Sequence, residues 1–136
     1  MFKSVSIIYP AFNEEKRLKK TFLDIEKFKK SNKFIKKKYI FVNDGSSDKT
    51  LSIIKKKIKN NIRIKVVSYN KNMGKGYALK RGIRVAKNDW VLTTDADCSV
   101  SNFQLTKWIK KKYLNQNNFI YFGSRNHRLS IVKKKN

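Results

Sequence analysis

Short apolar segments alternate with segments in which apolar side chains recur at helical spacing, and this alternation runs along almost the whole chain. The apolar segments predict strands at residues 4–9, 38–42, 62–69, 90–94 and 119–122. The helical spacing predicts helices between them, at about residues 14–30, 48–59, 75–86 and 103–114. Helical crossovers between short strands favour an α/β fold with a mostly parallel sheet, flanking helices and right-handed connections.

Local signals support the ends of these elements. Pro10 is expected to end the first strand. Glu14 and Glu15 are expected in the first turn of the helix that follows, where acidic side chains complement the helix dipole. Asp48 and Ser101 are expected to cap the second and the fourth helix.

Length and composition indicate one domain, expected over residues 1–136, with 40% apolar residues to build its core. A single cysteine, Cys98, and a single histidine, His127, exclude a disulfide framework and a zinc site made of those residue types. The chain has no apolar run long enough for a transmembrane helix. Its N-terminus lacks the apolar stretch of a signal peptide, so we expect a cytoplasmic location.

The net charge of +25, from 34 basic and 9 acidic residues, has two interpretations. It suits a polyanionic partner such as nucleic acid, an anionic membrane or a phosphorylated substrate. It is also what an AT-rich coding sequence would produce, since 28 of the basic residues are lysine and 14 residues are asparagine. Specific nucleic-acid recognition usually favours arginine, so no specific nucleic-acid partner is expected.

Polar side chains gather where the predicted strands end. In a parallel sheet these ends meet at one edge, which is where ligands bind in open α/β sheets. Although the chain has only 9 acidic residues, Glu14, Asp44, Asp95 and Asp97 all follow strands and are expected at that edge.

Asp95 and Asp97 lie two residues apart, just beyond the fourth strand. Two converging carboxylates repel each other unless a cation lies between them, and oxygen ligands suit Mg²⁺ or Mn²⁺, with phosphates completing the coordination. The alternative is that both side chains only cap loop N–H groups.

Two loops carry turn-forming residues and glycine. Residues 72–76 place Lys75 between two glycines at the start of a helix, where exposed N–H groups and a positive charge favour a phosphate. An ordinary turn into a helix is the alternative. Residues 43–46 form a β-turn in the simplest interpretation, because each of them favours turns.

Taken together and in order, these segments resemble the family 2 glycosyltransferases, which bind nucleotide sugars with the GT-A fold. The motifs are VSIIYPAFNEE at 5–15, VNDGSSDKT at 42–50, NMGKGYAL at 72–79 and DAD at 95–97. Residues 123–127 (GSRNH) and the Gly-Lys-Gly loop are most similar to dolichyl-phosphate β-glucosyltransferases, with the mannosyltransferases as close neighbours. Asn43 departs from the family, which usually has an acid there. Family domains extend beyond this motif, so an N-terminal part of a longer domain is expected.

The resemblance implies roles for individual residues. Pro10, Ala11 and Glu14 would line the nucleotide pocket, and Asp44 would contact the uracil or ribose. A further set would act on phosphates and metal: Gly74 and Lys75 near the base, ribose and diphosphate, Asp95 and Asp97 at the metal and diphosphate, and Arg125 at the acceptor phosphate, with His127 as a weaker candidate. Asp97 and Arg125 would be the catalytic residues.

The implied reaction is transfer of a sugar, with glucose from UDP-glucose favoured, to a polyprenyl phosphate with the help of Mg²⁺ or Mn²⁺. The chain would then lie at the cytoplasmic face of a membrane, where its lysines would approach anionic lipids. The alternatives are a family member with another sugar or acceptor, a non-catalytic basic nucleic-acid-binding fragment, and a sugar nucleotidyltransferase. A non-catalytic receiver-like α/β domain is a further alternative, which the loop around Lys75 disfavours. A nucleotidyltransferase would have a glycine-rich loop after the first strand, where this chain has residues 10–15 instead.

Overall fold

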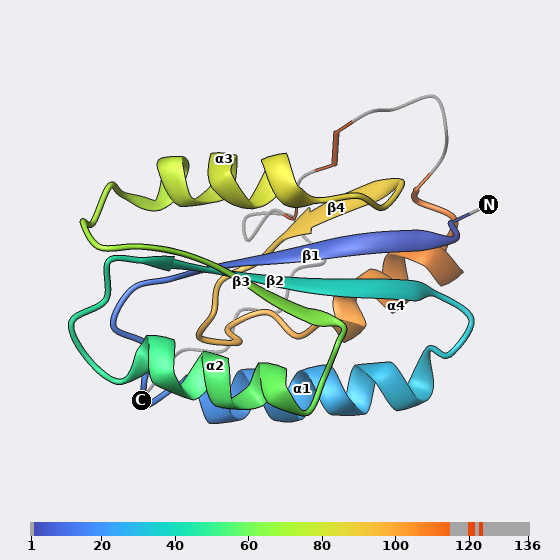
Figure 1. Cartoon of the computed structure of the whole chain (residues 1–136). Coiled ribbons are helices and arrows are strands. Elements are labelled where there is room, and N and C mark those ends of the chain that lie inside the picture. Colours follow the sequence, from blue (N-terminus) through green and yellow to red (C-terminus); the bar gives the residue numbers. More distant parts are fainter. Residues whose placement is uncertain (1, 115–119, 122, 124–136) are drawn as a thin grey trace, which may run out of the picture.

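The computed structural model describes residues 2–114, 120, 121 and 123, which form a four-stranded sheet with helices on both faces (Figure 1). The strands are β1 (Ser4–Ala11), β2 (Lys36–Asp44), β3 (Ile64–Tyr69) and β4 (Trp90–Thr93). The helices are α1 (Leu18–Ser31), α2 (Thr50–Lys59), α3 (Lys75–Val85) and α4 (Phe103–Lys110). The predicted alternation of strand and helix is confirmed over these elements. The strand predicted at 119–122 has both of its end residues outside the described residues, and Ile120 and Tyr121 are not in a strand.

All strands of the sheet are parallel, in the order β3-β2-β1-β4. β1 is a central strand, because it pairs with β2 from Ser4 to Ala11 and with β4 from Val5 to Ile8. β1 therefore lies between β2, the next strand in the sequence, and β4, the last strand of the sheet in the sequence. This topology brings the carboxyl ends of all four strands to one edge, as predicted.

The two faces of the sheet hold separate apolar clusters. Ile7, Tyr9 and Phe41 face the side covered by α1, where the rings of Tyr9 and Phe41 stack with their centroids 4.7 Å apart. Ile8 and Val42, one residue along each strand, pack on the other side with α3. Figure 1 shows α3 on one side of the sheet and α1 and α2 on the other. Side chains of β1 and β2 are buried on both faces, which explains the unbroken apolar runs at residues 7–11 and 39–42.

β1 continues through Pro10 to Ala11, so the prediction that Pro10 ends the strand is wrong. Backbone groups of alternate residues point to the same side of a strand, and the carbonyl of Ile8 accepts the N–H of Thr94, on the β4 side. Pro10 therefore directs its missing N–H to the side where β4 has already ended. Its proline ring interrupts no ladder bond there, and pairing with β2 continues.

α1 begins at Leu18, later than the predicted start at Glu14. The N–H groups of Arg17 and Leu18 both bond to the carbonyl of Glu14, so residues 14–17 form a turn that leads into the helix. The predicted helix starts at Asp48 and Ser101 agree with the structure more closely. Their side chains accept the N–H groups of the first residues of α2 and α4, respectively.

Within the described part of the chain, we find no helix with the length and apolar character needed to cross a membrane.

Candidate active site

The segments that follow the four strands form the candidate active site, and each is bonded to the next one. The segment after β1 contacts the segment after β2, which contacts the loop before α3. The first residue of α3 contacts the segment after β4. The site is thus one connected edge of the sheet, whose parts are far apart in the sequence.

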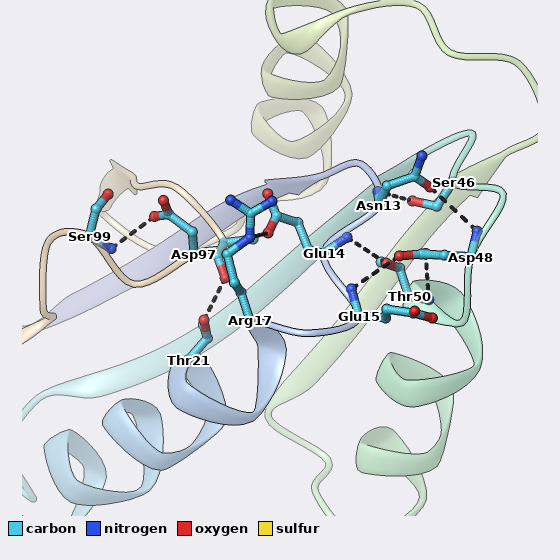
Figure 2. A network of polar contacts seen from close by, with 11 residues as sticks. Asn13, Glu14, Glu15, Arg17, Thr21, Ser46, Asp48, Thr50, Asp97 and Ser99 are labelled. Carbon is cyan, nitrogen blue, oxygen red and sulfur yellow. Dashed lines mark hydrogen bonds and ion pairs between the residues drawn. The ribbon is translucent and has the colours of Figure 1, made fainter. Parts of the chain in front are cut away.

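The contact between the segments after β1 and β2 is centred on Asn13 (Figure 2). Its Oδ1 accepts the N–H of Ser47 at 2.9 Å, the hydroxyl of Ser47 at 3.4 Å and the N–H of Asp48 at 3.4 Å. Its own N–H donates to Ser46 Oγ at 3.0 Å. Asn13 has a φ of 53°, a left-handed conformation that asparagine adopts more easily than most residues.

Glu14 and Glu15 extend this contact by bonding to residues 48–50. The N–H of Glu14 donates to Thr50 Oγ1 at 2.8 Å, and the N–H of Glu15 donates to Asp48 Oδ2 at 3.2 Å. In return, Glu15 Oε2 accepts the N–H of Lys49 at 2.9 Å. Burial alone would raise the pKa of Asp48, but its hydrogen bonds from Thr50 and Glu15 lower the pKa overall. Asp48 therefore joins the two segments as a carboxylate.

Glu14 lies between this contact and the aspartates after β4. Its Oε2 is 2.6 Å from Arg17 Nε, and its side chain is 16% exposed, against 52% for Arg17 (Figure 2). The pKa of Glu14 is raised, first by burial and then by the negative charges of Asp97, Asp48 and Asp95, while Arg17 opposes the rise. Glu14 and Asp97 thus lie within electrostatic reach of each other.

Asp44, at the end of β2, is buried, with 3% exposure. Its carboxylate accepts the N–H of Met73 at 2.8 Å, the N–H of Gly74 at 3.0 Å and the side-chain amide of Asn72 at 3.1 Å. The following Gly45 has a φ of 66°, and a Cβ there would lie 2.5 Å from the nitrogen of Asn72. Asp44 therefore holds the loop before α3 against β2, a structural role that the sequence did not predict.

Lys75 and Asp95 connect the next pair of segments. Lys75 is the first residue of α3, and its Nζ lies 2.5 Å from Asp95 Oδ1. The two side chains are 63% and 44% exposed, so this ion pair is open to solvent. Lys75 and Asp95, both predicted to meet a ligand diphosphate or its cation, are thus brought together at the edge of the sheet.

Asp95 and Asp97 lie on a turn after β4 that a hydrogen bond fixes to α1. The carbonyl of Ala96, which is buried, accepts the hydroxyl of Thr21 at 2.5 Å, so the turn is held on α1 (Figure 2). Asp95 precedes this anchor and Asp97 follows it. Asp97 Oδ1 accepts the N–H of Ser99 at 2.8 Å.

Asp95 and Asp97 could supply only part of the ligands that a hard divalent cation needs. Carboxylate oxygens are the ligands that Mg²⁺ and Mn²⁺ prefer, and Asp95 and Asp97 flank one turn held by Ala96. The described residues contain no group of three or more His, Cys, Asp or Glu side chains arranged to hold a metal. The residues present fit a cation whose remaining ligands are phosphate oxygens and water, as is common for Mg²⁺.

The other predicted site residues differ in how well they are placed. Pro10 is half-buried at the end of β1, beside Ala11. The side chain of Ala11 is 2% exposed and belongs to the core, so only its backbone could face a ligand. Gly74 has a φ of 89° directly before α3, a conformation that favours glycine. The predicted acceptor residues Arg125 and His127 lie outside the described residues.

The sequence analysis missed one set of contacts and one exposed residue at this edge. Asn13, Asp48 and Thr50 form the contact between the first two segments, but nothing in the sequence pairs residues 33 to 36 positions apart. Phe12 is 46% exposed between the predicted pocket residues Ala11 and Glu14. An aromatic residue directly after a strand, within a predicted binding motif, was the available signal for it.

A family model and several curated relatives match most of this chain. The sequence model described as Glycosyl transferase family 2 matches residues 6–134. A Dictyostelium discoideum protein named dolichyl-phosphate beta-glucosyltransferase is 37% identical over 133 residues, which cover 90% of this chain and 40% of that protein. The chain also spans 40% of a similarly named Trichomonas vaginalis relative.

Solved structures show the same fold. Staphylococcus aureus TarS 1-349 in complex with UDP-GlcNAc has a TM-score of 0.65 at 26% identity, over 79% of this chain and 30% of that one. The Pyrobaculum calidifontis mannosyltransferase PcManGT, in complex with GDP-Man and Mn²⁺, has a TM-score of 0.66 at 23% identity, over 78% of this chain and 31% of that one. These similarities confirm the predicted GT-A fold over part of a domain.

Proposed function

Because the chain belongs to glycosyl transferase family 2, we propose that its sheet edge binds a nucleotide sugar for transfer of the sugar to a polyprenyl phosphate. One observation carries the proposal: the segments after all four strands bond to one another and gather Glu14, Lys75, Asp95 and Asp97 at that edge. A purely structural edge would not need this concentration of charged groups in a chain with 9 acidic residues.

The donor is a nucleoside diphosphate sugar, with UDP-glucose favoured. The Dictyostelium relative is named as a glucosyltransferase acting on dolichyl phosphate, and the TarS structure holds a UDP-sugar. In this chain, Phe12 offers an exposed aromatic face for a base, and Lys75 with the first N–H groups of α3 offers positive charge for the diphosphate. Mannose transfer, with a guanine nucleotide as in the PcManGT complex, is the second donor to test.

The transfer breaks the bond between the sugar's anomeric carbon and the diphosphate, so negative charge grows on the departing diphosphate. Lys75 would stabilise that charge at a fixed position, because its backbone begins α3. A divalent cation held by Asp95 and Asp97 would neutralise further charge on the same phosphates. The acceptor phosphate is already anionic, so it needs no dedicated base in this chain. Arg125 stays the predicted contact of that phosphate.

A polyprenyl acceptor would place the chain at the cytoplasmic face of a membrane. Basic side chains near an anionic membrane each contribute about 1 kcal/mol to binding. The chain carries 34 of them, so electrostatic attraction would assist this approach without a specific lipid site.

Calorimetric titration tests the proposal. The chain is titrated with UDP-glucose, GDP-mannose and a DNA duplex, each with and without Mn²⁺. We expect Mn²⁺-dependent binding of UDP-glucose, and we expect Asp97→Asn to remove that dependence. Glu26→Gln is the matched control, because it removes one negative charge from α1, near Lys29 and Lys57 and outside the candidate site.

Binding of DNA alone, lost at high salt, would instead assign the basic surface to nucleic acid and reject the donor site. Equal binding of UDP-glucose by the Asp97→Asn variant, with unchanged dependence on Mn²⁺, would reject the role of Asp97.

A further inference from the structure

We propose that Asn13 is the positioning residue of the nucleotide pocket, acting through the segment after β2 rather than by touching the ligand. This inference rests on the proposed function. Asn13 lies directly between Phe12, whose ring is exposed, and Glu14, which faces the aspartates after β4. The conformation of this one residue therefore fixes the directions of both neighbours.

Asn13 combines two properties that few residues share. Its φ of 53° turns the chain sharply after β1, and its short side chain reaches across to accept hydrogen bonds from Ser47 and Asp48. Glycine would permit the same φ without any acceptor. Aspartate would keep the acceptor but add a negative charge next to Asp48 and Glu15.

The bonds that Asn13 makes continue directly into the neighbouring residues. The N–H of Glu14 is held by Thr50 and the N–H of Glu15 by Asp48, so three consecutive residues bond to one segment. Thr50 is the first residue of α2 and is fully buried, so the hydroxyl that accepts the N–H of Glu14 is fixed at the start of that helix. Without the Asn13 side chain, the N–H groups of residues 13–15 would keep their acceptors in the segment after β2. The N–H groups of Ser47 and Asp48 would lose theirs, and with it the contact that fixes the direction of the turn after β1.

The test compares Asn13→Gly, Asn13→Ala and Asn13→Asp with the unaltered chain, at a temperature where circular dichroism shows all of them folded. We expect Asn13→Gly and Asn13→Ala to bind UDP-glucose about tenfold more weakly, comparable to the loss of one or two hydrogen bonds. Asn13→Asp retains the acceptor and should stay within about threefold of the unaltered chain. Rescue by aspartate but not by glycine separates the acceptor from backbone conformation.

Ser52→Ala is the matched control, because the exposed hydroxyl of Ser52 donates to the carbonyl of Lys49 within the same segment and makes no contact with Asn13. We expect its affinity for UDP-glucose to be unchanged. Unaltered affinity in Asn13→Gly, or an equal loss in Ser52→Ala, would overturn the proposal.

Hydrogen exchange measured without any ligand separates this inference from the proposed function. The amides of Ser47 and Asp48 should exchange faster in Asn13→Gly and at the original rate in Asn13→Asp. If the unaltered chain binds no nucleotide sugar, the proposed function fails and Asn13 loses its role at a pocket. If the exchange rates do not change in Asn13→Gly, the positioning contact itself is refuted.

Discussion

Glu14 illustrates how a single carboxyl group at this edge is held against an unfavourable environment. Its side chain is mostly buried and lies in the field of three aspartates, and the pairing with Arg17 only partly offsets these effects. The raised pKa means that the ionised form is less stable in the folded chain than in the unfolded one. Such a residue contributes to a site more than to stability.

We therefore expect Glu14→Gln to be more stable than the unaltered chain at neutral pH. A raised folded-state pKa gives stability that is complete below the unfolded-state pKa of about 4.3 and is lost as pH rises through the folded-state pKa. The variant, which cannot ionise, avoids this loss. Urea unfolding at several pH values should show the two proteins converging near about pH 4 and separating above it. Equal stability at all pH values would contradict the raised pKa.

Under the proposed function, a divalent cation would compete with Lys75 for the carboxylate of Asp95. The expected result for Lys75→Gln is opposite changes in two affinities. Mn²⁺ alone should bind a few-fold more tightly, since an exposed ion pair contributes about 0.2–1 kcal/mol, while UDP-glucose should bind about tenfold more weakly. Calorimetry of each ligand separately measures both changes. A decrease in both affinities would show that Lys75 supports the cation rather than competing with it.

At the scale of elements, α3 packs directly against the side chains of the sheet at Gly82. A Cβ at Gly82 would lie 2.5 Å from Cγ2 of Ile8 and 3.1 Å from Cγ2 of Val42. The close packing places the first turn of α3, with Lys75, next to the ends of β1 and β2. The position of a candidate site residue thus depends on a glycine two turns further along the same helix.

Gly82→Ala should destabilise the chain by about 1–2 kcal/mol, because crowding of Ile8 outweighs the gain in helix propensity of about 1 kcal/mol. Gly76→Ala is the matched control in the same helix, since a Cβ there meets nothing within 4 Å. We expect this control to be neutral or more stable by up to about 1 kcal/mol. Urea unfolding measures both, and a stabilised Gly82→Ala would show that α3 can move away without cost.

The sequence predicted the elements well where a physical signal is local. Buried parallel strands have almost unbroken apolar sequences, and the helices carry apolar residues at their own spacing, so the elements could be recognised. The start of α1 was wrong because the N–H groups of Glu14 and Glu15 bond to Thr50 and Asp48, over 30 residues away. The end of β1 was wrong because Pro10 faces the side where β4 has ended.

The same distinction applies to the candidate site. Parallel topology alone predicted that Glu14, Asp44, Asp95 and Asp97 would share an edge. It could not predict their partners, such as the amides of residues 72–74 that donate to Asp44, because these contacts depend on loop conformations.

At the scale of the whole molecule, the charges are unevenly distributed. Six of the nine acidic residues lie at the carboxyl edge of the sheet: Glu14, Glu15, Asp44, Asp48, Asp95 and Asp97. The chain also carries 28 lysines, and its net charge of +25 gives the folded state internal electrostatic repulsion. Salt should screen that repulsion, because the Debye length falls from about 30 Å at 0.01 M to about 8 Å at 0.15 M.

The melting temperature of the chain should therefore rise when sodium chloride increases from about 0.01 M to about 0.15 M. Differential scanning calorimetry measures this shift. A substitution that replaces an exposed lysine by an acid, such as Lys55→Glu on α2, should raise the melting temperature at low salt and reduce its dependence on salt. A melting temperature that falls with salt would show that attractive ion pairs outweigh the net repulsion.

The central place of β1 has a consequence for synthesis on the ribosome. β1 is made first, yet one of its two neighbours is β4, and the hydroxyl of Ser4 bonds to Asp89, 85 residues later. While translation continues, one edge of β1 has no partner and its backbone groups stay open to incorrect pairing. Asp95 and Asp97 follow β4 in the sequence, so a nascent chain halted before them lacks both aspartates of the candidate site.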